Sequence, residues 1–255
     1  VYKRQELPEY DYLYLGDNAR APYGTRSFET VYHYTLEAVN WFFKQGCSLV
    51  ILACNTASAK ALRNIQQLDL PHIAPDKRVL GVIRPTTEVV GTFTSSGHVG
   101  IVGTTGTVTS ESYPTELHKF FPEIKVYQQA CPMWVPLIEN GEYDKPGADY
   151  FVKAYIDDLF AQSNKIDAIL LACTHYPLLE QKIMEHLPEG VKLIRQGDIV
   201  AKSLAKYLEK HPEIDEKCSK NGKIRFFTTD NAQVFEKQGS TFYGQKIEAL
   251  HTDLT

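Results

Sequence analysis

Short apolar runs alternate with amphipathic stretches along almost the whole chain. Residues 48–53 (SLVILA) and 168–171 (AILL) are continuous apolar runs that are too short for free-standing helices. Such runs are typical of parallel strands that are buried on both faces. At residues 27–45 and 150–162, by contrast, apolar residues recur at spacings of three and four, which predicts helices. Strands that alternate with helices predict an α/β protein with mainly parallel sheets.

Further segments of the chain show the same two patterns. We expect further strands at residues 12–15, 79–83, 99–102, 125–129, 191–194 and 224–228 and near Ile247. We expect further helices at residues 58–68, 178–187 and 198–210. Residues 212–222 are charged and polar, which predicts a solvated loop.

One pattern occurs twice, as LVILACNT at residues 49–56 and as AILLACTH at residues 168–175. Each copy has an apolar strand, then Ala-Cys, then two residues that can form hydrogen bonds. The copies are separated by about the length of one small α/β domain. We therefore expect two similar, pseudo-symmetric domains. Because parallel sheets bind ligands at the carboxyl ends of their strands, an active site in the cleft between the domains would hold Cys54 and Cys173.

A cysteine between a strand end and a helix N-terminus lies among backbone N–H groups, and this setting is expected to lower the pKa of the thiol. Four chemistries fit: acyl transfer by one thiol, a metal site, a redox disulfide, and proton transfer at a carbon atom between two thiols. Acyl transfer leaves the second copy unexplained, and no CxxC spacing supports a metal site or a redox disulfide. Both cysteines could also be small buried packing residues. The matched pair favours two-base proton transfer.

Composition excludes several classes of protein. The net charge of −4 argues against a nucleic-acid-binding protein and against a polybasic membrane-surface protein. No apolar run approaches the ~18 residues that a transmembrane helix needs. The five cysteines are an odd number spread thinly over 255 residues, which argues against a secreted disulfide framework and favours the cytoplasm.

Four motifs resemble those of the glutamate racemases, within the wider aspartate/glutamate racemase superfamily. They are GDNARAPYGTRS (residues 16–27), ACNTAS (residues 53–58), CPMWVPLIE (residues 131–139) and LACTHYPLL (residues 171–179). Together the motifs are highly specific, and the resemblance covers nearly the whole chain. Some members of the superfamily act on other substrates, but the Pro-Tyr-Gly loop and the Cys-Thr-His-Tyr-Pro motif point to glutamate.

The resemblance implies an isomerase that interconverts L- and D-glutamate without a metal or any other cofactor, and that supplies D-glutamate for peptidoglycan in the bacterial cytoplasm. It implies that Cys54 takes the Cα proton from D-glutamate and Cys173 from L-glutamate. His175 would assist Cys173, and Glu139 would be an auxiliary ionisable group. The residues implied to hold the substrate are Tyr23, Gly24, Asn55, Thr56, Thr174 and His175. The resemblance is also compatible with a homodimer.

The resemblance also implies interleaved domains and a departure at the first residues. The first domain would comprise residues 1–83 with 195–255, and the second residues 84–194. Glutamate racemases open with a strand that ends in Asp-Ser-Gly, and residues 1–5 do not match it. We therefore expect that strand to be missing, and its loss favours the alternative of a poorly soluble or catalytically impaired chain over the activity that the motifs imply. A related amino-acid racemase and a small-molecule-binding protein without catalysis remain alternatives.

Overall fold

The computed structural model describes residues 2–254 and confirms an α/β protein with parallel sheets. The end residues of the predicted domain division, Val1 and Thr255, lie outside the described part. Every strand pairing within that part is parallel. The strands are β1 (Tyr12–Gly16), β2 (Leu49–Leu52), β3 (Arg78–Gly81), β4 (His98–Gly103), β5 (Lys125–Ala130), β6 (Ala168–Ala172), β7 (Lys192–Ile194), β8 (Ile224–Thr228) and β9 (Ala249–His251).

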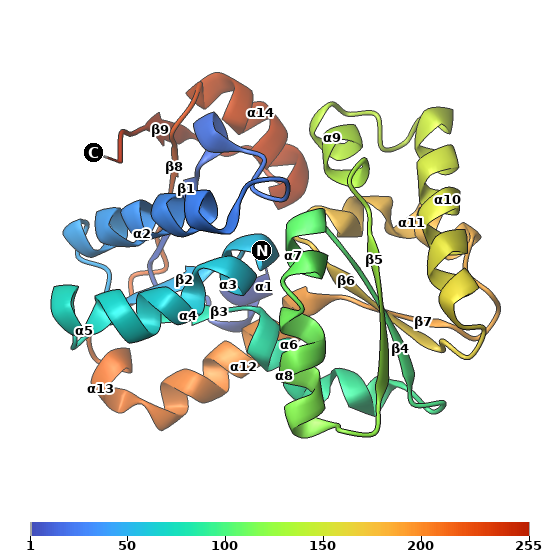
Figure 1. Ribbon diagram of the computed structural model, residues 1–255. Coiled ribbons are helices and arrows are strands. Elements are labelled where there is room, and N and C mark those ends of the chain that lie inside the picture. Colours follow the sequence, from blue (N-terminus) through green and yellow to red (C-terminus); the bar gives the residue numbers. More distant parts are fainter. Residues whose placement is uncertain (1, 255) are drawn as a thin grey trace.

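Helices surround the sheets on both sides (Figure 1). The α-helices are α1 (Tyr2–Glu6), α2 (Phe28–Lys44), α3 (Asn55–Lys60), α4 (Leu62–Asn64), α5 (Leu70–Ile73), α6 (Ile83–Val90), α7 (Thr105–Thr109), α8 (Ser112–Phe120), α9 (Trp134–Glu139), α10 (Pro146–Gln162), α11 (Glu180–Glu185), α12 (Gln196–Lys210), α13 (Pro212–Asp215) and α14 (Ala232–Tyr243). Short 3₁₀ helices span Asn18–Arg20, Gly91–Phe93 and Tyr176–Leu179, and a π-helical turn spans Ile65–Asp69.

The half drawn in green and yellow contains one four-stranded sheet, in the order β5-β4-β6-β7 (Figure 1). Strand β6 is buried throughout and supplies both faces of the core. Ile169 and Leu171 pack in a cluster with residues of α9, α10 and α11, whereas Leu170 packs in a cluster with residues of α6 and α8. This two-sided burial explains why the strand reads as a continuous apolar run.

The other half contains two separate sheets, one with the order β1-β8-β9 and one formed by β2 and β3. Tyr12 of β1 lies opposite Ile224 of β8, so the earliest strand pairs with one of the latest. Helix α2 covers this region, where the Trp41 ring packs edge-on against Phe227 with ring centroids 5.1 Å apart. Val50 of β2 belongs to a separate buried cluster with residues of α2 and the α4 region.

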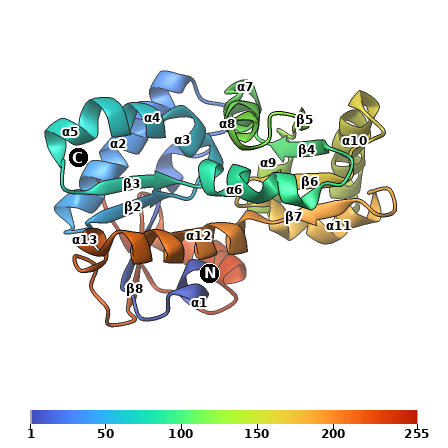
Figure 2. The ribbon, with the colours of Figure 1, turned by 90° about the horizontal axis from the view of Figure 1, so that it is seen from below.

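The chain passes between the halves twice. It leaves β3 through α6 to reach β4, and it returns from β7 through α12. Helices α6 and α12 lie against each other at this junction (Figure 2). The two crossings are therefore neighbours in space.

The residues that flank α2 set its two ends. The Ser27 side chain caps the helix by accepting a hydrogen bond from the Thr30 N–H at 3.1 Å. Gly46 follows the helix with φ at 87°, a left-handed conformation that favours glycine.

Two of the expected elements were wrong. The helix expected at residues 58–68 begins at Asn55 and is interrupted, because α3 ends at Lys60 and a π-helical turn starts at Ile65. The loop expected at residues 212–222 begins instead with α13, whose Ile214 is buried against α12. Here one apolar residue anchors a polar segment to the core.

Candidate active site

The two matched cysteines follow strands in opposite halves of the molecule. Cys54 comes after β2 and caps the N-terminus of α3, and it is half-buried. Cys173 comes directly after β6 and is 9% exposed. The charge of a Cys173 thiolate raises the pKa of Cys54, so the two sulfur atoms lie within electrostatic range of each other. The structure thus brings together the two halves of the repeated pattern.

The expectation that the pKa of Cys54 is lowered is wrong, because the effects that raise this pKa are larger. Burial raises the pKa of the Cys54 thiol above its ordinary value, and the nearby Cys173 raises it further. The backbone N–H groups of Ala57 and Thr56 lower it, as expected at a helix N-terminus, but they do not prevail. In the free protein Cys54 is therefore a thiol at neutral pH, able to give a proton to a carbanion.

A histidine and a carboxylate accompany Cys173. His175 Nδ1 lies 3.8 Å from Cys173 Sγ, and His175 Nε2 lies 3.2 Å from Glu139 Oε1. Burial lowers the pKa of His175, but the interactions with Cys173 and Glu139 outweigh it and raise that pKa to about 10. The ring is therefore an imidazolium at neutral pH, with one N–H toward the sulfur and the other toward the carboxylate. Both residues come from the half that carries Cys173.

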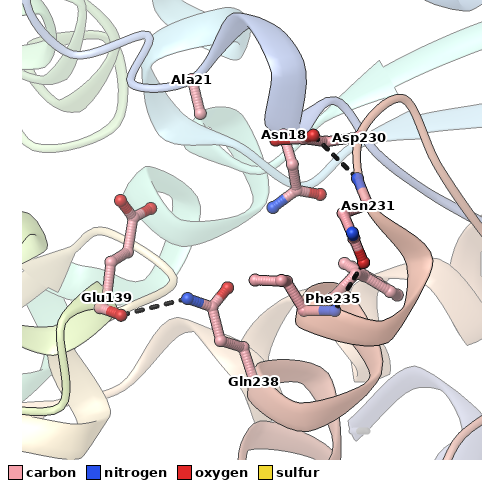
Figure 3. A pocket seen from close by; sticks show the side chains of 8 residues that line it. Asn18, Ala21, Glu139, Asp230, Asn231, Phe235 and Gln238 are labelled. Carbon is pink, nitrogen blue, oxygen red and sulfur yellow. Dashed lines mark hydrogen bonds between the residues drawn. The ribbon is translucent and has the colours of Figure 1, made fainter.

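Helix α14, which belongs to the opposite half, contacts both His175 and Glu139. Phe242 packs edge-on against the His175 ring, with ring centroids 5.5 Å apart. The side-chain amide of Gln238 donates to the backbone oxygen of Glu139 at 3.1 Å. Glu139 and Gln238 also line a pocket of about 200 Å³, in which they face Asn18 and Phe235 (Figure 3). Helix α14 therefore supports the side of the site that carries Cys173.

The loop between β1 and α2 holds Tyr23 near Cys54. The Tyr23 hydroxyl donates to Asp17, whose carboxylate also forms an ion pair with Arg20 at 2.8 Å. Burial raises the pKa of Tyr23, and the Asp17 carboxylate and a Cys54 thiolate raise it further. The phenol is therefore neutral and held in place by Asp17, a residue that the sequence analysis did not single out.

Three hydroxyl groups meet where the two halves touch. Thr56 Oγ1 lies 2.9 Å from Thr104 Oγ1 and 3.4 Å from Thr107 Oγ1. Close by, the Gly106 N–H donates to the Gly24 backbone oxygen at 2.7 Å. Thr56 and Gly24, two of the expected substrate residues, therefore lie at a contact between α7 and the first half.

This contact leaves no room for a side chain at Gly106. A Cβ there would lie 2.8 Å from the Gly24 backbone oxygen and 3.0 Å from Lys60 Nζ. We expect Gly106→Ala to lower the free energy of unfolding by about 1–3 kcal/mol and to reduce activity, because the halves must shift apart. Gly147→Ala is the matched control, since its Cβ would meet nothing within 4 Å. Thermal melts and activity of both variants test this, and equal effects would contradict it.

Asn55 and Thr174 differ in their surroundings. Asn55 is 2% exposed, and its side-chain amide is hydrogen-bonded to Gln196 and Tyr113. Thr174 is exposed, with its hydroxyl 3.5 Å from His175 Nδ1. Gln196 and Tyr113 are not marked by any repeated motif in the sequence, and each lies far from Asn55 along the chain.

The chain is similar to known racemases over nearly its full length. The profile of the Asp/Glu/Hydantoin racemase family matches residues 2–204. A glutamate racemase from Geobacter metallireducens is 38% identical, over 94% of this chain and 86% of the relative. One from Persephonella marina is 38% identical, over 98% and 90%. This chain belongs to the glutamate racemase family. Membership confirms the family resemblance of the four motifs.

Solved glutamate racemases share the fold. The enzyme from Bacillus anthracis superposes with a TM-score of 0.88 at 34% identity, over 99% of this chain and 91% of that one. The enzyme from Francisella tularensis, solved in complex with D-glutamate, gives a TM-score of 0.87 at 31% identity, over 99% and 91%. These superpositions confirm the α/β fold that the sequence predicts for this family member.

The described residues also form no metal-binding cluster, membrane-spanning helix or disulfide. In residues 2–254, no cluster of three or more His, Cys, Asp or Glu side chains is arranged to hold a metal ion. No helix in the same residues has the length and apolarity to cross a bilayer. All five cysteines are free, and Cys131 is fully buried as a packing residue. Independence of metal and cofactor stays a prediction.

Proposed function

We propose that this chain interconverts L- and D-glutamate by moving the Cα proton between two thiols. The observation that carries the proposal is the placement of Cys54 and Cys173 at strand ends in opposite halves, within electrostatic range of each other. One thiolate removes the Cα proton and becomes a thiol, leaving a planar carbanion. The other thiol gives its proton to the opposite face and becomes a thiolate, so protons and charge balance. A general acid and a general base each contribute ~10²–10⁴-fold.

The two faces would use different helpers. On one face Cys173 takes the proton from L-glutamate, and the His175 imidazolium, held by Glu139, orients the sulfur and balances its charge. On the other face Cys54 takes the proton from D-glutamate. The backbone N–H groups that follow Cys54 favour its thiolate, and they oppose the effect of burial. The relative from Francisella tularensis, solved with D-glutamate, supports a glutamate site in this fold.

The substrate would lie among groups from both halves. Tyr23, Gly24 and Thr56 come from the half with Cys54, whereas Thr174 and His175 come from the half with Cys173. Asn55 joins the first group through its backbone N–H at the start of α3, where a carboxylate is favoured. Hydroxyl and N–H donors on both sides suit a dicarboxylate.

The wider setting is part of the same proposal. The domains comprise residues 1–83 with 195–255, and residues 84–194; the distribution of β4 to β7 in one sheet supports this division. D-glutamate would supply peptidoglycan synthesis in the cytoplasm. The bacterial sources of the relatives support this role. A homodimer stays a prediction.

The direct test incubates the purified chain with L- or D-glutamate and follows optical rotation. We expect each enantiomer to be converted to the racemate, with no conversion of L-aspartate at matched concentration. Conversion of aspartate alone would point to a related racemase. Binding of glutamate without conversion would favour the non-catalytic alternative.

Metal and cofactor independence is tested on the same protein. We expect racemisation to be unchanged after dialysis against EDTA, because two thiols supply the acid and the base without a Lewis acid. Absorbance spectra should also lack a pyridoxal phosphate band. Loss of activity on dialysis and its return with added divalent metal would overturn this expectation.

A further inference from the structure

A closed ring of hydrogen bonds surrounds the side chain of Asn55, the residue after Cys54. Asn55 Nδ2 donates to Gln196 Oε1 at 2.7 Å. Gln196 Nε2 donates to the Tyr113 hydroxyl oxygen at 2.5 Å, and that hydroxyl donates back to Asn55 Oδ1 at 2.5 Å. Each side chain gives one hydrogen bond and receives one within the ring. Hydrogen bonds in such a closed chain polarise and strengthen one another in the protein interior.

The ring also ties Asn55 to both crossings between the halves. Gln196 is the first residue of α12, where the chain returns from β7. Its Nε2 donates a second hydrogen bond, to Thr86 Oγ1 on α6 at 3.0 Å. Thr86 in turn donates to the backbone oxygen of Val82, at the outgoing crossing, at 2.8 Å. One glutamine amide therefore links the outgoing crossing, the return crossing and the start of α3.

Burial makes this arrangement rigid. Asn55 is 2% exposed, and Tyr113 and Thr86 are fully buried. A buried polar group that loses its partner costs more than the hydrogen bond itself contributes, so the ring has one favoured arrangement. Because the Asn55 amide is planar, the ring also fixes the direction of the second Nδ2 hydrogen.

We propose that Gln196 and Tyr113 are positioning residues, which hold Asn55 and through it set the place of Cys54 relative to the opposite half. The inference rests on the proposed function, since it assigns the ring to the proton transfer on the Cys54 face. A ring that served stability alone would have no reason to affect one face more than the other. The asymmetry between the faces is therefore the measurable consequence.

The test uses two variants that keep their packing. Tyr113→Phe removes the hydroxyl and keeps the ring of the side chain, and Gln196→Met keeps the length and removes the amide. The matched control is Gln66→Met, because the Gln66 amide donates to the Val79 backbone oxygen at 2.7 Å in the same half and takes no part in the ring. The measurements are thermal melts, kcat and KM in each direction, and exchange of the Cα proton of each enantiomer in deuterated water.

For both ring variants we expect kcat to fall by about 10- to 100-fold with KM nearly unchanged, since small displacements of a reacting group have effects of this size. Exchange at D-glutamate, the substrate of Cys54, should fall more than exchange at L-glutamate. The double variant should lose no more than the worse single variant, because either change breaks the same ring. The Gln66→Met control should keep both exchange rates.

Other results would overturn the inference. Equal losses of exchange at both enantiomers, or lower melting temperatures with unchanged kcat, would assign the ring to stability alone. Tyr113→Phe keeps the buried aromatic side chain, so it provides the decisive variant if Gln196→Met does not fold. If the unchanged protein does not racemise glutamate, the proposed function itself fails. If it does and the ring variants match the control, only the positioning role fails.

Discussion

Replacing either Cys54 or Cys173 by serine is expected to lower racemisation by ~10²–10⁴-fold, the range for loss of a positioned acid or base. A serine hydroxyl is a weak nucleophile and base unless another group activates it. The two variants should differ in which enantiomer still exchanges its Cα proton with the solvent. Cys54→Ser should still exchange the Cα proton of L-glutamate through Cys173, and Cys173→Ser should still exchange that of D-glutamate.

Proton NMR in deuterated water measures each exchange separately, and circular dichroism measures net racemisation. Cys218→Ser is the matched control, because this free, half-buried thiol lies beyond α13 and donates to the Ile214 backbone oxygen. Full racemisation by Cys173→Ser would rule out the two-base mechanism. Loss of both exchanges in both variants would show that the thiols do not act on separate faces.

Replacing His175 by glutamine is expected to reduce racemisation by about 10²-fold, at the lower end for an acid–base group, because it assists Cys173. It should also change how stability depends on pH. The pKa of His175 is about 10 in the folded protein, against an ordinary value of 6.5. The ring binds its proton more tightly when folded, so its stabilisation is complete below pH 6.5 and is lost as the pH rises through 10.

Melting temperatures at pH 6 and pH 10 separate this effect from other titrations. The unchanged protein should exceed His175→Gln in melting temperature by several degrees at about pH 6, and much less at about pH 10. His33→Gln is the matched control, since His33 forms an exposed pair with Glu29 at 3.7 Å on α2. A difference that does not change with pH would refute the imidazolium at His175.

The helices and strands that could be predicted are those whose structure follows from the residues of the same short segment. Strand β6 is recognisable because all its residues are buried, which requires a continuous apolar run. Helix α14 is not recognisable in the same way, because Gly239, Ser240 and Thr241 are poor helix formers. Its stability comes from distant contacts, such as the close approach of Gly239 to Ile247.

The same distinction applies to the site. Cys54 and Cys173 could be found because the chain repeats a strand, a cysteine and two polar residues. Gln196 and Tyr113 could not, because their role depends on how two crossings of the chain meet in space. The net pKa of Cys54 could not be predicted either. The helix N-terminus is visible in the sequence, whereas the burial that outweighs it is a property of the assembled fold.

The pairing of β1 with β8 has a consequence for synthesis on the ribosome. Tyr12 emerges early, but its partner Ile224 emerges only after every strand of the four-stranded sheet has been made. During that time β1 has no β8 to complete its sheet, while β4, β5, β6 and β7 can already pair. Helix α14, which supports His175 and Glu139, follows β8 and comes later still. The contacts that α14 makes with His175 and Glu139 can therefore form only after translation has passed that helix.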